Sequence, residues 1–182
     1  MSMAVSRPVC KTPPLIVVMG VSGCGKTSVG KQLAARLGTP FVEGDALHPQ
    51  ENVKKMAAGI PLQDVDRGPW LDRIGAAIAQ AAGAGEGLVV SCSALKKAYR
   101  DRLRRGAGGR LCFVFLQGTR ELLKRRMEAR TGHFMPPALL DSQLATLEDP
   151  SGEDGVVAVT IAMTVEDIVL AAVAGLEQAK TE

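Results

Sequence analysis

The stretch that decides the fold is LIVVMGVSGCGKT, which runs from Leu15 to Thr27. Its first five residues are apolar, and this two-sided apolar character is typical of a central strand in a parallel sheet. The remaining eight residues, Gly20 to Thr27, match the pattern G-x-x-x-x-G-K-[ST] in full. Apolar residues then recur at helical spacing as far as Leu37, and Gly38 marks the end of the predicted helix. The stretch therefore predicts a strand, a glycine-rich loop and a helix in that order.

A glycine-rich loop in this position is suited to phosphate. Glycine lets the backbone turn tightly and bring N–H groups close to phosphate oxygens, and the following helix directs its positive end at the anion. Lys26 would reach the β- and γ-phosphates, and the hydroxyl of Thr27 would ligate Mg²⁺. The alternative, a turn that only joins strand to helix, is disfavoured because both flanking elements fit. The residues predicted to bind the nucleotide from this loop are Gly20, Ser22, Gly23, Cys24, Gly25, Lys26, Thr27 and Ser28.

Strands and helices alternate along the rest of the chain. Short apolar runs at 41–42, 88–90, 111–116 and 156–161 predict four more strands. Helical patterns separate them, and one of these helices is expected to open at Pro69. This alternation predicts a three-layer α/β fold, with a five-stranded parallel sheet covered by helices on both faces. No linker divides the chain, so residues 15–182 are expected to form one domain behind a flexible tail at 1–14.

The composition excludes several classes of partner. The 182 residues carry 22 Lys and Arg against 19 Asp and Glu, a net charge of +3, and only 3% are aromatic. Nucleic-acid binders usually have a stronger basic bias or aromatic stacking platforms, so no nucleic-acid partner is expected. No apolar run approaches the ~20 residues that span a bilayer, so no membrane partner is expected either. The four cysteines lack C-x-x-C spacing and are interpreted as reduced thiols of a cytoplasmic protein.

A phosphate-binding loop leaves the acceptor of the phosphoryl group undetermined. A GTPase would carry a guanine-reading N-K-x-D motif, which the chain lacks. A motor ATPase usually has an apolar strand that ends in a metal-binding Asp, whereas the strand at 88–90 runs into Ser91-Cys92-Ser93. The short chain leaves room for one nucleotide site and one small acceptor site. These features favour a kinase that acts on a small metabolite.

Asp45 follows the strand at 41–42, at the carboxyl end where open parallel sheets bind their ligands. A carboxylate there can accept a hydrogen bond from a substrate hydroxyl and take its proton during attack on the γ-phosphate. The alternatives are an aspartate that orients a metal-bound water and one that serves as a helix N-cap or lies in a turn. His48 follows as a candidate for acceptor binding, although a single histidine is more often structural.

Basic residues supply candidates for binding an anionic acceptor. These candidates are Lys54, Arg67, Lys96 and Arg100. Lys96 and Arg100 are four residues apart, so they are expected to share one helix face just beyond the strand at 88–90. The alternative for each is a solvated basic face.

A second basic pair predicts a lid. Arg126 and Arg130 are also four residues apart and precede a loop that contains Gly132. A lid around 126–140 would close over the triphosphate and exclude water, which is a competing acceptor. The two guanidinium groups would neutralise the charge that develops on the transferred group. An exposed basic helix is the alternative interpretation of the same spacing.

Six stretches of the chain carry a resemblance to a known family. They are the loop at 20–27, EGDALHP at 43–49, NVKKM at 52–56, PLQDVDRGPWL at 61–71, CSALKKAYRD at 92–101 and RTGHF at 130–134. Together they resemble the gluconokinases of the small P-loop type. The similarity extends from about residue 15 to residue 180. It implies transfer of the γ-phosphoryl group of ATP to the 6-hydroxyl of D-gluconate, with Mg²⁺ as cofactor. It also implies a nucleoside- and shikimate-kinase-like fold with a helical lid, a homodimer, and a product that enters the pentose phosphate or Entner–Doudoroff route.

The resemblance also implies roles for individual residues. The catalytic residues are then Asp45, Lys26 and Arg130, and Arg126 joins Arg130 in binding ATP. The contacts to the acceptor are Asp45, His48, Lys54, Arg67, Lys96, Arg100 and His133. The chain departs from the family pattern at Glu43, where the family often has Asp, and at Cys24, where Ser is common.

Two other functions remain open at this stage. A shikimate-type kinase would use the same loop with a different hydroxylated acid as acceptor. A regulatory module that binds a nucleotide without catalysis would be expected to lack Lys26 or Asp45, and both are present.

Overall fold

The computed structural model describes residues 13–129 and 137–179. Their strands form one sheet in the order β2-β3-β1-β4-β5, and every neighbouring pair is parallel. The strands are β1 (Leu15–Met19), β2 (Phe41–Glu43), β3 (Leu88–Ser91), β4 (Leu111–Gln117) and β5 (Val156–Thr160). The predicted five-stranded parallel sheet is confirmed.

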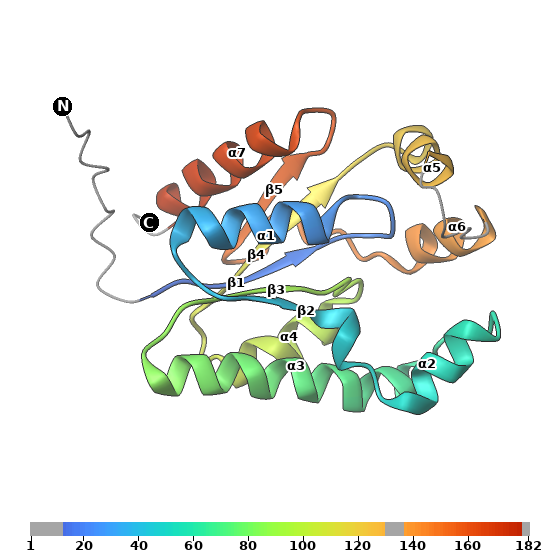
Figure 1. Ribbon diagram of the computed structural model, residues 1–182, viewed down its shortest axis with the longest axis horizontal. Helices are drawn as coiled ribbons and strands as arrows, with labels where there is room; N and C mark the ends of the chain where they lie inside the picture. Colours follow the sequence, from blue (N-terminus) through green and yellow to red (C-terminus); the bar gives the residue numbers. More distant parts are fainter. Residues whose placement is uncertain (1–12, 130–136, 180–182) are drawn as a thin grey trace.

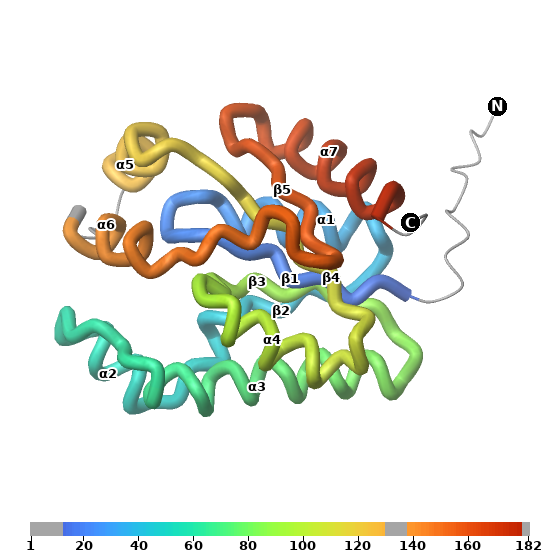
Figure 2. The backbone as a smooth tube through the Cα atoms, turned by 180° about the vertical axis from the view of Figure 1, so that it is seen from behind, coloured from blue at the N-terminus to red at the C-terminus, as the bar shows by residue number. Residues whose placement is uncertain are grey.

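Helices cover both faces of this sheet and also gather at one of its ends (Figures 1 and 2). One face carries α1 (Lys26–Leu37) and α7 (Val165–Gln178), and the other carries α3 (Asp64–Ala84) and α4 (Lys97–Gly106). The elements beyond the carboxyl ends of the strands are a short 3₁₀ helix, η1 (Gly44–Leu47), with α2 (Gln50–Ala57), α5 (Arg120–Glu128) and α6 (Pro137–Thr146). This end of the sheet is therefore where ligands are expected to bind.

The central strand β1 is buried on both faces. Ile16 and Val18 pack into the core between the sheet and the α1–α7 layer. Val17 and Met19 point the other way and pack into the core shared with α3 and α4. Alternate side chains of a strand point to opposite faces, so two cores require a continuous apolar run, as the sequence of β1 predicts.

Helix α3 begins five residues before the predicted start at Pro69. Gln63 and Asp66 form a capping box, in which each side chain accepts a hydrogen bond from the other residue's backbone N–H. This pair starts the helix at Asp64 and leaves Pro69 inside it. The predicted start at Pro69 is wrong, because the capping box begins the helix five residues before the proline.

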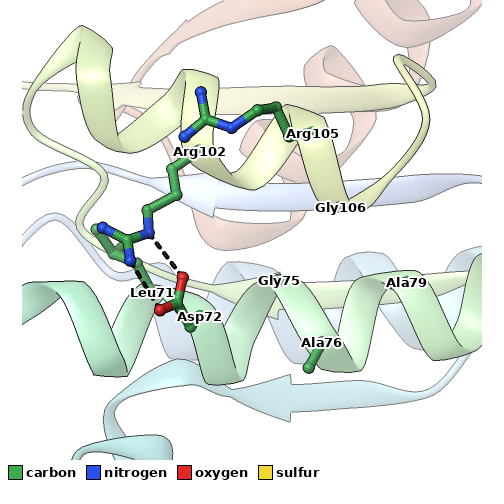
Figure 3. Close-up of a pocket in the computed structure, with 8 residues that line it drawn as sticks. All are labelled: Leu71, Asp72, Gly75, Ala76, Ala79, Arg102, Arg105 and Gly106. Atoms are coloured by element: carbon green, nitrogen blue, oxygen red, sulfur yellow. Dashed lines mark hydrogen bonds and ion pairs between the residues drawn. The ribbon is translucent and has the colours of Figure 1, made fainter.

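A groove of about 520 Å³ lies between α3 and α4 (Figure 3). Its lining includes Gly75 and Ala79 of α3, and the guanidinium of Arg102 on α4 forms a two-fold ion pair with Asp72 on α3, with both N–O distances at 2.7 Å. The groove is lined by the middle of α3 and the second half of α4, so it is separate from the glycine-rich loop.

Among the described residues, no helix has the length and apolar character needed to cross a bilayer.

Candidate active site

The loop between β1 and α1 has the geometry of a phosphate cradle. Gly25 is the N-cap of α1 and has φ +94°, a left-handed conformation that a residue with a β-carbon adopts only with strain. The cap residue supplies no side-chain acceptor, and the first turn of α1 has no acidic residue. Neither the cap nor the first turn of α1 therefore supplies an acceptor to the N–H groups at this helix start, which fits the binding of an anion such as the phosphates of ATP.

Lys26 and Thr27 are held by neighbours at this loop. The ammonium of Lys26 donates to the carbonyl of Val21 at 3.2 Å. The Thr27 hydroxyl donates to Glu43 Oε2 at 2.6 Å, and the Ser91 hydroxyl donates to the other oxygen of the same carboxylate. Glu43 thus joins α1 to the ends of β2 and β3 beside the hydroxyl predicted to bind Mg²⁺. No local pattern in the sequence marks this link.

The backbone at Gly44 is fixed immediately before Asp45. The Gly44 N–H donates to the Ser91 hydroxyl at 3.1 Å, and its carbonyl accepts from the indole N–H of Trp70 at 2.8 Å. A β-carbon at Gly44 would lie 1.9 Å from the Ser91 carbonyl oxygen, so only glycine fits this close approach. Asp45 follows with a side chain that is 69% exposed. A rigid support therefore presents the carboxylate at the carboxyl end of β2, as a base for a bound hydroxyl requires.

His48 lies behind Asp45 rather than on the open surface. Its side chain is only 5% exposed, and Nε2 lies 4.0 Å from Asp45 Oδ1. The imidazole stacks on Trp70 with ring centroids 4.2 Å apart. Burial lowers the pKa of His48, and the nearby carboxylate of Asp45 opposes this shift in part. The neutral form is therefore favoured at pH 7.

The structure brings Arg67 and Lys96 together around one aromatic ring. The Arg67 guanidinium carbon lies 6.0 Å from the centre of the Tyr99 ring, and Lys96 Nζ lies 5.6 Å from it. Lys96 also donates to both oxygens of Asp64, at 2.9 and 2.8 Å, and the Tyr99 hydroxyl donates to the same carboxylate. The hydrogen bond from Lys96 holds the pKa of Asp64 below its usual value. Asp64 and Tyr99 were not among the predicted site residues. The only sequence signal for them is that they lie in the stretches at 61–71 and 92–101, which carry the family resemblance.

Arg100 is a correction to the sequence-based expectation. Its side chain is fully buried, with no exposed surface, although it shares the helix with Lys96. Its Nη1 donates to the carbonyls of Ala94 and Leu95, while Nε and Nη2 bind Glu153, and Nη2 also donates to the Glu148 carbonyl. These contacts use all the donors of the guanidinium, so none remains for an acceptor. Arg100 holds the loop before β5 in place.

We expect Arg100→Leu to lower the free energy of unfolding by about 3 kcal/mol, because it leaves carbonyls and a carboxylate without their buried donor. Arg100 holds the pKa of Glu153 below its ordinary value of 4.5, so the difference from wild type persists at neutral pH and shrinks only in acid. Urea unfolding at pH 7 and pH 4 measures both effects. The exposed Arg105→Leu on the same helix is the control, and equal stability of the two variants would contradict this role.

The other predicted residues differ in how the structure places them. Arg126 lies at the loop, since its Nη1 would be 3.8 Å from a β-carbon on Gly25, and its Nη2 donates to the Ile161 carbonyl at 2.6 Å. Lys54 is exposed on α2, and its side chain makes no hydrogen bond or ion pair with the residues described. Arg130 and His133 lie outside the described residues, so their predicted roles stay predictions.

Helix α6 also contacts the phosphate loop. The side-chain oxygen of Gln143 accepts a hydrogen bond from the backbone N–H of Ser22 at 2.7 Å. The two residues are 121 positions apart in the chain, and no local pattern marks Gln143. The backbone N–H of Ser22 in the phosphate loop is therefore bound by α6, a helix whose first residues fall within the predicted lid at 126–140.

Comparisons with known proteins identify the family. The profile of a family described as AAA domain matches residues 15–150. The gluconokinase of Gluconobacter oxydans is 50% identical over 148 residues, which cover 81% of this chain and 83% of that protein. The chain belongs to the gluconokinase family. The gluconokinase structure from Sinorhizobium meliloti superposes with a TM-score of 0.87 at 56% identity, over 93% of this chain and 95% of that one.

Membership in the gluconokinase family confirms the resemblance drawn from the sequence. A shikimate kinase from Acinetobacter baumannii, solved with shikimate, has a TM-score of 0.59 at 20% identity, covering 94% of this chain and 97% of that one. This likeness shows the fold alone. Gluconokinases and shikimate kinases share this fold, so the fold alone does not decide between the two families. The sequence identity to gluconokinases does.

Proposed function

We propose that the chain is a gluconokinase that transfers the γ-phosphoryl group of ATP to the 6-hydroxyl of D-gluconate, giving 6-phospho-D-gluconate and ADP. The observation that carries this proposal is the arrangement of three parts at one end of the sheet. They are the phosphate loop, the exposed carboxylate of Asp45, and the pair Lys96 and Arg67 around Tyr99. The family relatives at 50% and 56% identity give the substrate.

The nucleotide side of the site follows from the loop. The backbone N–H groups at the start of α1 would bind phosphate oxygens, and Lys26 and Arg126 would balance the charge of the triphosphate. Thr27 would hold Mg²⁺, with Glu43 fixing the orientation of its hydroxyl at 2.6 Å. When bound, the metal neutralises charge on the β- and γ-phosphates. Most of the contribution of the protein is positioning and electrostatic stabilisation, as phosphoryl transfer requires.

The acceptor side can hold a sugar acid by its two ends. Gluconate has a carboxylate at one end and a primary alcohol at the other. Lys96 and Arg67 are cations that would bind the carboxylate, while Asp45 would accept the proton of the alcohol as it attacks the γ-phosphorus. Fixing both ends holds the attacking oxygen in line with the phosphorus.

Lys96→Met is expected to raise the KM for gluconate by about 10- to 100-fold and to leave the KM for ATP unchanged, because a charged hydrogen bond to the acceptor is lost. Steady-state kinetics with each substrate varied in turn measures the two constants. The neighbouring Lys97→Met is a matched control, because Lys97 pairs with Asp101 on the helix surface at 2.6 Å. An unchanged KM for gluconate would remove Lys96 from the acceptor site.

Five further features belong to the same proposal. Residues 126–140 form a lid that closes over the triphosphate, and Arg130 and His133 belong to it. The tail at 1–14 lies outside the kinase domain at 15–182. The enzyme is a cytoplasmic homodimer, and its product enters the pentose phosphate or Entner–Doudoroff route. The position of Arg126 at the phosphate loop and the contact of α6 with Ser22 support the first of these features.

An assay of ADP release tests the proposed function. The purified chain is expected to release ADP with D-gluconate and Mg²⁺–ATP, and ³¹P NMR is expected to show a phosphate ester at C6. Shikimate and nucleoside monophosphates serve as competing acceptors, and they are expected to give no turnover above the hydrolysis background. Turnover with shikimate alone, or ATP binding without any acceptor activity, would contradict the proposal.

A further inference from the structure

We infer that His48 is a positioning residue for Asp45, and that Asn52 fixes its imidazole in the neutral form that carries the proton on Nε2. This nitrogen is the one that faces Asp45. The inference rests on the proposed function, in which Asp45 receives the proton of the acceptor alcohol. It replaces the sequence-based prediction that His48 contacts the acceptor directly.

The hydrogen bonds of Asn52 determine the tautomer. Asn52 is buried, and its Nδ2 donates to the backbone carbonyl of Asp66 at 2.8 Å. A carbonyl only accepts, so the atom in this position is the amide nitrogen and not the oxygen. The same nitrogen lies 3.2 Å from His48 Nδ1 and has a second N–H to give. Since an amide nitrogen does not accept, Nδ1 carries no proton, and the proton of the neutral ring is on Nε2.

The surroundings of the ring also favour the neutral form. Protonating Nδ1 would place two N–H groups against each other at the contact with Asn52. The charged groups that face the ring are Asp45 on η1 and Arg67 on α3, and the second of these opposes a positive charge. The nearby Asp66 carboxylate is already occupied by Lys55 at 2.6 Å and by the Gln63 N–H at 3.0 Å. Burial, which includes the stacking on Trp70, is the largest cause that lowers the pKa of His48, and Arg67 lowers it further while Asp45 opposes the shift.

A neutral His48 can orient the carboxylate of Asp45 without placing a positive charge beside it. The N–H of an uncharged imidazole orients the carboxylate, whereas a cation in the same place would also reduce its basicity. His48 Nε2 is 4.0 Å from Asp45 Oδ1, about 1 Å beyond hydrogen-bond distance, so the inferred contact forms when the exposed Asp45 side chain moves toward the ring. Trp70 supports both partners, because it stacks on the imidazole and donates to the Gly44 carbonyl.

The wild-type protein tests the tautomer directly, because the chain has only two histidines. Long-range ¹H–¹⁵N NMR spectra distinguish protonated from unprotonated ring nitrogens, and the signals that vanish in His48→Gln belong to His48. At pH 7 we expect an unprotonated Nδ1 and a protonated Nε2, with a titration midpoint below the ordinary 6.5. A proton on Nδ1, or a charged ring at pH 7, would overturn the inference.

Kinetics of two His48 variants test the positioning role. His48→Phe keeps a ring that can stack on Trp70 and loses the donor, so kcat is expected to fall about 10- to 100-fold with both KM values within about two-fold. His48→Gln places an amide N–H near the position of Nε2 and is expected to recover most of kcat. Equal losses in the two variants, wild-type kcat in His48→Phe, or a change confined to the KM for gluconate would each contradict the role.

Asn52→Asp tests the source of the tautomer. A carboxylate in place of the amide accepts from Nδ1–H, so we expect the proton of His48 to move to Nδ1 and its titration midpoint to rise above that of the wild type. Unchanged His48 signals in this variant would show that Asn52 does not fix the tautomer. If the wild type fails to phosphorylate gluconate, the proposed function is wrong, whereas the NMR spectra still decide the state of His48.

Discussion

Lys26→Ala is expected to lower kcat for phosphorylation of gluconate by about 10³-fold or more, since it removes the cation that stabilises the charge on the transferred phosphoryl group. Lys26 is at the first position of α1, where its ammonium donates to the Val21 carbonyl within the loop. The variant is expected to fold, because the side chain is not part of the apolar core. A coupled assay of ADP release measures kcat, and thermal unfolding measures stability.

Lys31→Ala is the matched control for this variant. Lys31 is an exposed lysine on the same helix, one turn further from the loop. It is expected to keep wild-type kcat and a similar melting temperature. If Lys26→Ala retained more than about a tenth of wild-type kcat, the loop would not be the site of phosphoryl transfer.

Asp45→Asn is expected to lower kcat by about 10²- to 10⁴-fold while the dissociation constant for ATP changes by less than about two-fold. An amide keeps the shape of the side chain and does not take up a proton at neutral pH, so the loss isolates the proton-accepting role. Asp45 is 69% exposed, so its replacement is not expected to disturb packing. Isothermal titration with ATP and steady-state kinetics with gluconate measure the two effects.

The control for this variant is Asp154→Asn. Asp154 is exposed in the turn before β5, at the opposite edge of the sheet from Asp45. Wild-type kinetics are expected for this variant. A kcat for Asp45→Asn within about three-fold of the wild type would remove Asp45 from the reaction, and a lost ATP affinity would assign it to the nucleotide side instead.

The fold and the nucleotide loop could be predicted because their signals are local. The apolar run of β1, the glycines of the loop and the amphipathic pattern of α1 follow one another within 23 residues, from Leu15 to Leu37. A strand buried on both faces needs such a run, and a phosphate loop needs its glycines and lysine in a fixed order. Asp45 could be placed because carboxyl ends of parallel strands share one edge of the sheet.

The parts that were missed depend on contacts between distant residues. Spacing puts Lys96 and Arg100 on one helix face, yet Arg100 is covered by Glu153 from 53 residues away. Spacing does not reveal which distant residues cover a helix face. For the same reason, the contact of Asn52 with His48 and the contact of Gln143 with the phosphate loop could not be predicted from the sequence. The start of α3 was missed because the Gln63–Asp66 capping box outweighs the position of Pro69.

The most direct test is a crystal structure of the wild-type chain with D-gluconate, Mg²⁺ and a non-hydrolysable ATP analogue. The 6-hydroxyl of gluconate is predicted to hydrogen-bond to Asp45 and to lie about 3–3.5 Å from the γ-phosphorus, in line with the bond that breaks. Its carboxylate is predicted to bind Lys96 and Arg67. A gluconate bound in the reverse direction, or a γ-phosphate outside the loop at 20–27, would contradict the proposed mechanism.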